Sequence, residues 1–361
     1  MTAVPTSRTG RLEGIDLARA VAMIGMLMVH VGPTGGDDPL GRLYALPHGH
    51  ASVLFMLVAG VGVSLLAGSP QATVAGTAAQ LAWRALLLLP LGLALQSLDD
   101  GRLVILQTYA LMFLLAIGAH RLPDRVLLCV VGVMAVGGPI GYLYGKLLDP
   151  VTFSRVGIGL DQSPGGILHG LVLSGPYPLI TWIVPFALGL WLGRHDLHAQ
   201  PIRSRMVLAG CGVAIATAVT AGALQAWLQE PRVQPGWDQL ILMEPHSQMP
   251  LWLAGSTASA VAVLGLTLMI ADRGGHRLWP LVATGQAALT FYVGHLIALA
   301  LWPRTLTAEQ PLQALGITLA FTAAFAALMV GWRRLHARGP LEIPLQLPRH
   351  LRPRWRSLHR T

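Results

Sequence analysis

The sequence predicts an all-α, polytopic membrane protein with about ten transmembrane helices and both termini in the cytoplasm. Of the 361 residues, 53% are hydrophobic and only 11% are charged, and the mean hydropathy is +0.58. A soluble domain has about 25% charged residues, so this chain lacks the polar side chains that would cover a globular surface. Several apolar runs also approach ~20 residues, the length that crosses the hydrocarbon core of a bilayer.

Apolar runs, separated by polar or Pro- and Gly-rich breaks, divide the chain into ten predicted spans within one membrane domain, residues 1–361. The predicted spans are 15–33, 51–68, 80–98, 103–120, 125–146, 177–194, 204–227, 250–271, 279–302 and 310–332. Between the fifth and sixth spans, the short apolar piece 167–173 is typical of a re-entrant or interfacial segment.

The distribution of basic residues supports this division. If the N-terminus is cytoplasmic and the spans alternate, 19 of the 25 Lys and Arg lie on inner segments and six on outer segments. This asymmetry follows the positive-inside rule, and one missed or invented span would scramble it. We therefore expect an even number of spans, with residues 333–361 forming a basic cytoplasmic tail that rests on anionic lipid.

The composition also limits the function. The net charge of +9 is explained by this membrane topology, so it does not indicate nucleic-acid binding. Cys129 and Cys211 lie in apolar runs without the spacing of a disulfide framework or a metal site. Asp16 and Arg19 interrupt the first apolar run, and no small-residue cleavage pattern follows His30, so we expect a retained helix. The predicted location is the inner (plasma) membrane, with the lipid bilayer as a partner.

Polar residues of the first span share one face. At 100° per residue, Asp16, Arg19 and His30 lie on one stripe with Met23 and Leu27. Charged groups in a membrane helix usually face the bundle interior or a water-filled cavity. We therefore expect this stripe to line an interior surface, with polar groups near both membrane faces. The alternative is a local ion pair between Asp16 and Arg19 at the interface, which would contribute little.

Several of the 13 histidines map to the outer half of the predicted bundle or to its outer loops. They are His30, His48, His50, His169, His246 and His295. A neutral imidazole can take a proton from an attacking hydroxyl or amine near neutral pH, so these side chains are candidate general bases. No His-x3-His spacing supports a metal site, so no metal is expected.

The predicted span 279–302 carries a further group of polar and aromatic residues. As one helix, it would place Thr284 and His295 on the same face, with Tyr292 beside them and Gln286 pointing the other way. A histidine in a membrane helix is a functional candidate by default, and the alternative is a hydrogen-bonded packing residue.

The predicted span 177–194 begins with Tyr177 and Trp182 and contains Pro185. Tyr and Trp at a membrane boundary are typical of an aromatic belt. Proline in a membrane helix frees a backbone carbonyl, which needs a partner from a neighbouring helix or a cavity. These aromatic side chains are therefore candidates for structural or for binding roles.

Five segments of the chain form an ordered set of motifs. They are Arg11-Leu-Glu-Gly-Ile-Asp-x-x-Arg19-Ala, His48-Gly-x-Ala-Ser52-x-Leu-Phe55, Tyr177-Pro-Leu-Ile-x-Trp182, His246-Ser, and Ala283-Thr-Gly-Gln286-x-x-Leu-Thr290-x-Tyr292-x-x-His295. This set resembles the bacterial YeiB-like integral membrane family, which is related to heparan-α-glucosaminide N-acetyltransferase within the transmembrane acyltransferase superfamily. The ending Trp332-Arg-Arg-x-x-x-x-Gly339-Pro-Leu-Glu342 is also similar to that family, and the resemblance runs through most of the chain.

The resemblance implies about ten helices and transfer of an acyl group across the membrane. The donor would be cytoplasmic acyl-CoA, with an acetyl group expected, and the acceptor an extracytoplasmic glycan-like hydroxyl or amine. The related acetyltransferase has a histidine in its first outer loop that is implicated in transfer. Here His48 and His50 lie in the corresponding loop at a different spacing, whereas His295 matches by its position in the motif.

These expectations assign a role to each candidate residue. The candidate catalytic residues are His295, His48, His50 and His30. The candidate CoA-binding residues at the inner mouth are Arg19, Arg84, Asp16 and Arg194. The candidate acceptor-binding residues are His246, Tyr177, Trp182, Tyr292 and Gln286. A passage lined by the stripe of the first span would connect the two groups.

Two other classes of function remain open from the sequence. A transporter or channel for a polar solute could use the same residues as binding groups, and Pro185 would favour it through a discontinuous helix. A membrane-embedded assembly or sensor protein would need no catalysis. The sequence also leaves open whether the protein forms a homo-oligomer.

Overall fold

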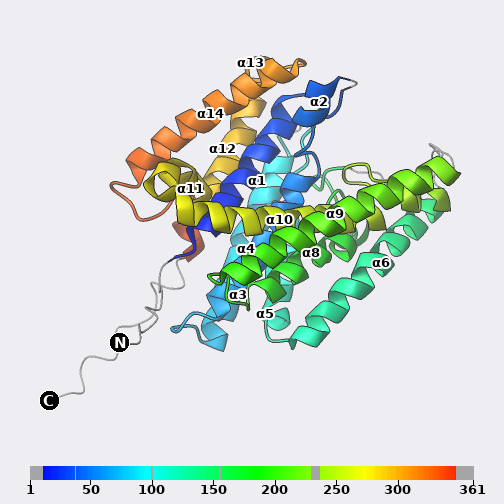
Figure 1. Ribbon diagram of the computed structural model, residues 1–361, viewed down its shortest axis with the longest axis horizontal. Helices are drawn as coiled ribbons and strands as arrows, with labels where there is room; N and C mark the ends of the chain where they lie inside the picture. Colours follow the sequence, from blue (N-terminus) through cyan, green and yellow to red (C-terminus); the bar gives the residue numbers. More distant parts are fainter. Residues whose placement is uncertain (1–10, 37, 99–100, 154–155, 229–235, 347–361) are drawn as a thin grey trace.

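The computed structural model describes residues 11–36, 38–98, 101–153, 156–228 and 236–346. These residues form an all-α bundle without a strand, in which long helices cross one another at varied angles (Figure 1). The N-terminal residues 1–10, the predicted basic tail beyond residue 346, and Arg155 and Arg232 of the outer loops lie outside the described residues.

Each of the ten predicted spans corresponds to a helix or to a pair of helices. These are α1 (Glu13–Val31), α3 (His50–Ala67), α4 (Val74–Gln96), α5 (Leu106–Ala119), α6 (Asp124–Leu148), α8 (Leu179–Leu192), α9 (Gln200–Leu228), α10 (Pro250–Gly274), α11 (Trp279–Gln286) with α12 (Ala288–Leu301), and α14 (Pro311–Trp332). The shorter elements are α2 (Pro39–Tyr44), α7 (Pro164–His169), the π-helical turn η1 (Gly170–Ser174), η2 (Trp237–Ile241), η3 (Gly275–Leu278), α13 (Pro303–Leu306) and η4 (Pro344–Gln346).

The fold class is that of a polytopic membrane protein. Within the described ranges, seven helical stretches are long and apolar enough to cross a membrane, and the bent pair formed by 164–174 and α8 would be an eighth. Helices α5 and α12 have 14 residues each, which is about 21 Å at 1.5 Å per residue and shorter than a hydrocarbon core of roughly 30 Å. The predicted number of ten crossings therefore remains a prediction.

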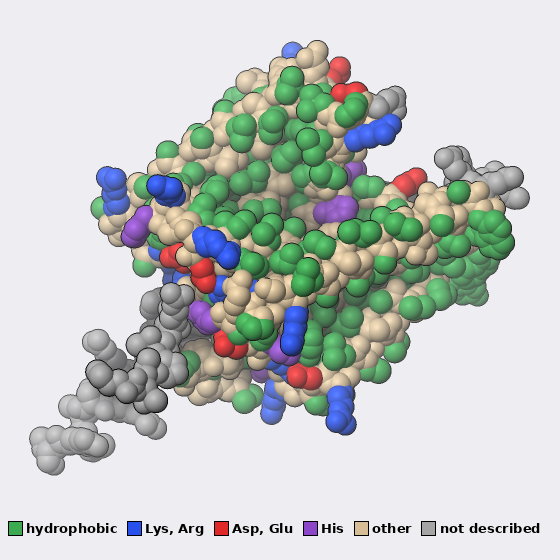
Figure 2. Space-filling view, in the orientation of Figure 1, with side chains coloured by type: hydrophobic (Ala, Val, Ile, Leu, Met, Phe, Trp, Pro, Cys, Tyr) green, Lys and Arg blue, Asp and Glu red, His purple; other side chains and the backbone are tan. Residues whose placement is uncertain are grey.

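Burial separates a central group of helices from a peripheral one. In the most apolar 18-residue stretch of each helix, 67% of the residues are buried in α1 and 72% in α3, whereas only 11% are buried in α9. Apolar side chains cover much of the visible face in Figure 2, and α9 and α6 lie at the outer right of the bundle in Figure 1. Helix α1, which carries Asp16, Arg19 and His30, is thus at the centre of the molecule. The buried Met23 and Leu27 confirm that its predicted stripe faces the interior.

Close helix crossings in this centre depend on glycine. A Cβ on Gly285 would lie 1.7 Å from the backbone oxygen of Asp16, so α11 can approach α1 only with glycine at this position. Similarly, a Cβ on Gly189 of α8 would lie 2.1 Å from the backbone oxygen of Leu57 in α3. The first of these crossings brings Gln286 next to the Asp16 carboxylate.

The chain reverses direction between α10 and α11. Leu268 packs beside Gly14 and Gly285 packs beside Asp16, so residues 17 apart in sequence contact positions only two apart on α1. The apolar stretch Pro250–Gln286 is therefore folded back at η3, although its length and composition alone allow one span. This reversal agrees with the predicted division between spans 250–271 and 279–302.

The prediction of one continuous helix over 279–302 is wrong. Helix α11 ends at Gln286, Ala287 has φ −113° and ψ 35°, and α12 begins at Ala288. The new helix is capped from far away in the sequence, because the Glu342 carboxylate accepts hydrogen bonds from the backbone N–H groups of Leu289 and Thr290. Residues on the two sides of the break consequently do not share a helical face.

Segments from different parts of the chain meet near each end of α1. Near Asp16, Arg11 lines one cavity with His198 and Arg203, which belong to another predicted inner segment. Near His30, the backbone N–H of Ala308 donates to the carbonyl of Val31, so two predicted outer segments meet there. We refer to these as the Asp16 end and the His30 end; the assignment of each end to a side of the membrane remains a prediction.

Candidate functional site

At the Asp16 end, α1 holds a buried carboxylate between two arginines. The Asp16 side chain is 2% exposed, and its Oδ2 and Oδ1 accept hydrogen bonds from Arg11 Nε at 2.6 Å and Arg19 Nη1 at 2.7 Å. Gln286 Nε2 also donates to Asp16 Oδ2, at 3.2 Å. A buried charge with several hydrogen bonds can fix the orientation of its partners, so Asp16 orients the arginines that surround it.

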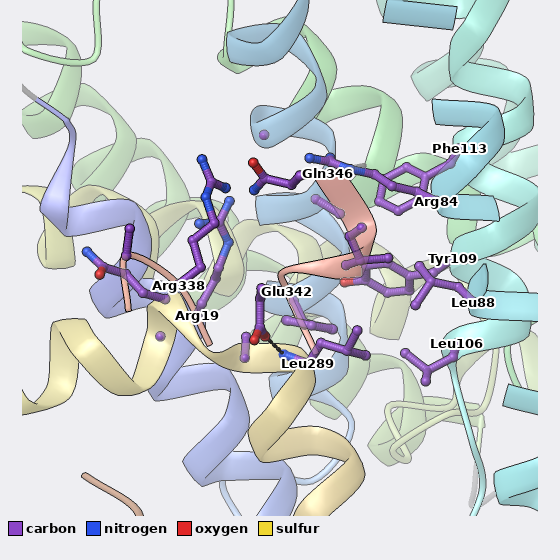
Figure 3. Close-up of a pocket in the computed structure, with 18 of the residues that line it drawn as sticks. Arg19, Arg84, Leu88, Leu106, Tyr109, Phe113, Leu289, Arg338, Glu342 and Gln346 are labelled. Atoms are coloured by element: carbon purple, nitrogen blue, oxygen red, sulfur yellow. Dashed lines mark hydrogen bonds between the residues drawn. The ribbon is translucent and has the colours of Figure 1, made fainter. Parts of the chain in front are cut away.

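Five arginines from four parts of the chain line one cavity of about 290 Å³, which we call the arginine pocket. They are Arg11, Arg19, Arg84, Arg333 and Arg338, and one carboxylate, Glu342, lines the same pocket. Figure 3 shows Arg19 and Arg338 side by side, with Arg84 on the opposite wall. Guanidinium groups bind phosphates and carboxylates in bidentate geometry, so the pocket is suited to a multiply charged anion.

The deep wall of the arginine pocket is apolar. Phe55, Leu88, Leu106, Tyr109 and Phe113 form it, and the Arg84 guanidinium lies 5.9 Å from the centre of the Phe113 ring. An ion above an aromatic face is stabilised by the ring quadrupole. The pocket therefore combines a charged mouth with an apolar interior.

The C-terminal strap, residues 339–346, closes one side of this pocket. Glu342 Oε2 accepts from Thr290 Oγ1 at 2.7 Å, the Leu341 N–H donates to the same hydroxyl, and Trp83 Nε1 donates to the Pro344 carbonyl. Burial raises the pKa of the Glu342 carboxyl, although these hydrogen bonds oppose the rise. The strap is thus fastened to α12 and to α4.

Several buried polar atoms in the arginine pocket have no hydrogen-bond partner. They are the Tyr109 hydroxyl, Gln286 Oε1, and Arg333 Nε and Nη1. Tyr109 is only 5% exposed. A buried polar group without a partner is unfavourable by about 1–3 kcal/mol, so such a concentration marks a place where a ligand can supply the partners.

At the His30 end, two histidines from different helices form a pair. His30 Nδ1 lies 3.0 Å from His295 Nε2, and the two rings stack with centroids 5.3 Å apart. His295 is fully buried, whereas His30 lines a cavity of about 30 Å³ together with Tyr177, His246 and Tyr292. That volume is about the share of one water molecule in the liquid.

The hydrogen bonds assign the neutral tautomers of this pair. His295 Nδ1 lies 3.1 Å from the Phe291 carbonyl, which can only accept, so His295 Nδ1 carries the proton and its Nε2 accepts. His30 Nδ1 must then be the donor to His295, and the lone pair of His30 is on Nε2. Because His30 is the histidine of this pair that lines the cavity, it is the better placed general base, and His295 orients it.

The other predicted aromatic residues gather around His246. Its ring stacks on Trp182, with centroids 5.9 Å apart, and contacts Tyr177 and His48 at 5.5 Å and 5.9 Å. Tyr177 lines the small cavity, but Trp182 is fully buried behind His246. Trp182 is therefore placed to support the histidine and not to contact an acceptor.

Sequence reasoning missed Gln248, which holds this cluster together. Its fully buried side chain accepts from Thr181 Oγ1 at 2.6 Å and Trp182 Nε1 at 3.0 Å, and it donates to the Pro176 and His246 carbonyls. Both His246 and Gln248 have positive φ values, 59° and 67°, which is uncommon outside glycine. The sequence motif included His246 and Ser247 but not Gln248, because nothing in the sequence distinguishes a structural glutamine in a loop from any other.

Two predicted placements need correction. Arg194 is not part of the arginine pocket: it forms an ion pair with Asp124 at 2.6 Å and donates to the His120 carbonyl. Gln286, predicted to bind the acceptor, lies at the Asp16 end, where the α1–α11 crossing brings its Nε2 to 3.2 Å from Asp16 Oδ2. Neither loop histidine lines the small cavity: His50 Nδ1 bonds the His48 carbonyl, and the His48 ring contacts the His246 ring.

The predicted passage along α1 is interrupted. The arginine pocket and the small cavity have no lining residue in common. Tyr292 lines the small cavity, and its hydroxyl accepts a hydrogen bond of 3.1 Å from the backbone N–H of Ile105. The structure thus contains two separate cavities at the two ends of α1.

The fold and these cavities define a polytopic helical membrane protein with an arginine-lined pocket and a histidine cluster. Residues 192–346 match the model of a family described as Protein of unknown function (DUF418). The matched region contains α9, α10, α11, α12 and α14, and so includes His246, His295 and Glu342. A comparison with curated proteins gives no match.

Proposed function

We propose that the protein is a membrane-embedded acyltransferase that moves an acyl group, expected to be acetyl, from cytoplasmic acyl-CoA to an extracytoplasmic hydroxyl or amine of a glycan-like acceptor. The observation that carries this proposal is the position of two chemically distinct sites on one helix. Arg19 of the arginine pocket and His30 of the histidine pair are 11 residues apart on α1, roughly 16 Å at 1.5 Å per residue.

The arginine pocket supports a polyphosphate donor. Its five arginines and one glutamate leave an excess of positive charge, and phosphate groups are the anions that such clusters bind most directly. The unpartnered Tyr109 hydroxyl and the apolar wall are suited to the pantetheine arm, which carries amides on an otherwise apolar chain. The resemblance of the motifs to the YeiB-like family points to the same class of donor.

The histidine pair supports activation of the acceptor. In the proposed step, His30 Nε2 removes the proton from the acceptor hydroxyl or amine as its oxygen or nitrogen attacks the thioester carbonyl. The new bond to carbon forms, the carbon–sulfur bond breaks, and the CoA sulfur leaves as a thiolate that then takes up a proton. His295 keeps His30 in the tautomer that has its lone pair on Nε2.

The proposal is tested with purified protein in inverted vesicles, using acetyl-CoA labelled in the acetyl group and a mixture of glycan acceptors inside. We expect label to move to an acceptor, and His30→Ala to reduce this transfer by roughly 10²–10⁴-fold. A matched control is His198→Ala, which removes an exposed histidine at the other end. Label that stays on CoA with every acceptor, or transfer that is unchanged in His30→Ala, contradicts the proposal.

A transporter for a polar solute is the second candidate. It is favoured by two helix breaks, the 61° bend between 164–174 and α8 and the break at Ala287, because transporters bind substrates at discontinuous helices. The same vesicles separate the two functions. Net movement of an unmodified solute without transfer of label supports the transporter, and covalently labelled acceptor supports the acyltransferase.

A further inference from the structure

The layer between the two cavities is thin. On three separate segments, a residue lining the arginine pocket lies three positions from a residue lining the small cavity: Phe55 and Ser52 on α3, Leu106 and Leu103 before and within α5, and Leu289 and Tyr292 on α12. For the pairs on α3 and α12, three helical residues rise by about 4.5 Å, which is less than one helical turn. We call this layer the partition.

A polar contact between Tyr292 and Ile105 crosses the partition. The Tyr292 hydroxyl accepts from the Ile105 N–H, and both residues are almost fully buried, at 1% exposed each. Ile105 directly precedes α5, so its N–H belongs to the group of helix-terminal donors without a partner inside the helix. The Tyr292 hydroxyl accepts the hydrogen bond of this donor, and the Tyr292 side chain fills the space between the arginine pocket and the small cavity.

We infer that Tyr292 is a gate between the arginine pocket and the small cavity. A net intramolecular hydrogen bond contributes only about 0.5–1.5 kcal/mol, so a ligand group that replaces the hydroxyl at Ile105 removes one of the contacts that hold Tyr292 in place. An amide or thioester carbonyl is such a group, because it accepts a hydrogen bond as the hydroxyl does. The pantetheine arm of a donor bound in the arginine pocket would thus displace the Tyr292 hydroxyl with one of its carbonyl groups and extend toward His30.

The position of Tyr292 on α12 links the gate to both sites. Leu289, one turn earlier, lines the arginine pocket, and His295, one turn later, holds His30. A small rotation of α12 would therefore move the gate and the histidine pair together. In this respect the inference rests on the proposed function, which requires the donor arm to reach from the arginine pocket to His30.

Thiol labelling tests the gate without measuring acyl transfer. The parent is the full-length protein with Cys129→Ala and Cys211→Ala, to which Leu289→Cys is added as a reporter in the arginine pocket. The protein is reconstituted in vesicles, and a membrane-impermeant maleimide is added at the His30 end only. We expect the parent to be labelled no faster than a protein without the reporter cysteine, and the labelling rate to rise at least tenfold above this background when Tyr292→Ala is added.

A matched variant and a milder one complete the test. Tyr44→Ala removes another buried tyrosine, whose hydroxyl bonds the Met28 carbonyl away from the partition, and should leave the reporter unlabelled. Tyr292→Phe keeps the ring, so it should fold even if Tyr292→Ala does not, and it should give an intermediate labelling rate.

The gate is overturned if the parent is already labelled from the His30 end. It is also overturned if neither Tyr292 variant changes the labelling rate, or if Tyr44→Ala increases it equally. A gate that behaves as expected in a protein without acyl transfer would leave the gate standing and contradict the proposed function.

Discussion

At the scale of single residues, hydrogen-bond partners assign different tasks to side chains that the sequence cannot distinguish. His30 and His295 are both membrane histidines, yet one lines a cavity and the other bonds a backbone carbonyl. His295 therefore acts as a positioning residue, through the tautomer of His30. Gln248 has a comparable position behind His246.

His295→Leu should lower kcat for transfer by roughly 100-fold and leave the KM for the donor unchanged, because it removes the acceptor of the His30 Nδ1 proton. Measured steady-state kinetics with labelled acetyl-CoA check this split. His295→Gln should recover part of the rate, since its amide oxygen can accept the same hydrogen bond. Equal loss in both variants, or a change confined to KM, would contradict the assigned role.

Gln248→Leu should lower the free energy of unfolding by about 1–3 kcal/mol, because Trp182 Nε1 would be a buried donor without an acceptor and Thr181 Oγ1 would keep only its longer bond of 3.2 Å to the Pro178 carbonyl. Denaturant unfolding in micelles measures the change. Gln162→Leu is the matched control: Gln162 is only half-buried, with one hydrogen bond to the Gly157 carbonyl, so its replacement should change stability by less than about 1 kcal/mol. Similar losses in the two variants would show that Gln248 has no special supporting role.

The sequence allowed part of the site to be predicted at this scale. Helical periodicity placed Asp16, Arg19 and His30 on one interior stripe, because an unbroken helix converts sequence spacing directly into angle and height. The contact between Gln286 and Asp16 was not predicted, because it depends on the α1–α11 crossing, which sequence spacing does not reveal. Arg194 lies outside the arginine pocket, and the sorting of charges could not show this, because it assigns an arginine to an end of the bundle and not to a pocket.

At the scale of elements, α12 and the C-terminal strap form one unit. The strap supplies the cap that α12 lacks in its own sequence, and it also supplies one side of the arginine pocket. The sequence predicted an apolar helix over 279–302, but nothing local marks the break, since neither proline nor glycine stands at position 287. The cap comes from Glu342, more than 50 residues away, and long-range pairing of this kind is not encoded in local patterns.

Gly339→Ala should raise the KM for an anionic donor severalfold. A Cβ on Gly339 would lie 2.1 Å from Glu342 Oε2 and 2.8 Å from the Ala287 Cβ, so the strap would have to move away from the pocket. Gly331→Ala is the control: nothing lies within 4 Å of a Cβ there, and alanine within α14 should be neutral or slightly stabilising. An unchanged KM in Gly339→Ala would mean that the strap does not contribute to binding.

The pH dependence of stability should reflect Glu342. Burial raises the pKa of its carboxyl above the ordinary value of 4.5. A carboxyl with a raised pKa contributes stability below its ordinary pKa, and that contribution is lost as the pH rises through the raised pKa. Glu342→Gln is neutral throughout, so its melting temperature relative to the unmodified protein should increase between about pH 4 and pH 7. Thermal unfolding across this range measures the difference, and a constant difference would contradict the shift.

At the scale of the whole molecule, the helical bundle places positive charge and imidazoles at opposite ends of one central helix. Hydropathy alone predicted every major helix. In lipid, the backbone N–H and C=O groups of such an apolar chain must form their hydrogen bonds within the protein, and a helix provides these bonds. The interruption of the passage was not predictable, since it depends on one tyrosine reaching a backbone amide from another helix.

His48→Cys and His246→Cys, each in a background without native cysteines, should react with an impermeant thiol reagent added to intact cells. His198→Cys, exposed at the Asp16 end, should react only after permeabilisation. This result follows from the positive-inside rule, which places the Asp16 end in the cytoplasm. The reverse pattern of labelling would invert the topology and remove the cytoplasmic donor from the proposal.

The continuity of α1 from Glu13 to Val31 has a consequence for the choice of substrate. A continuous helix keeps Arg19 and His30 at a constant distance, so the bound donor itself must be long enough to span that distance. The protein should therefore select donors by the length of the arm between the anionic group and the acyl group. A donor analogue with a shortened arm should bind to the arginine pocket, fail to reach His30, and inhibit without reacting.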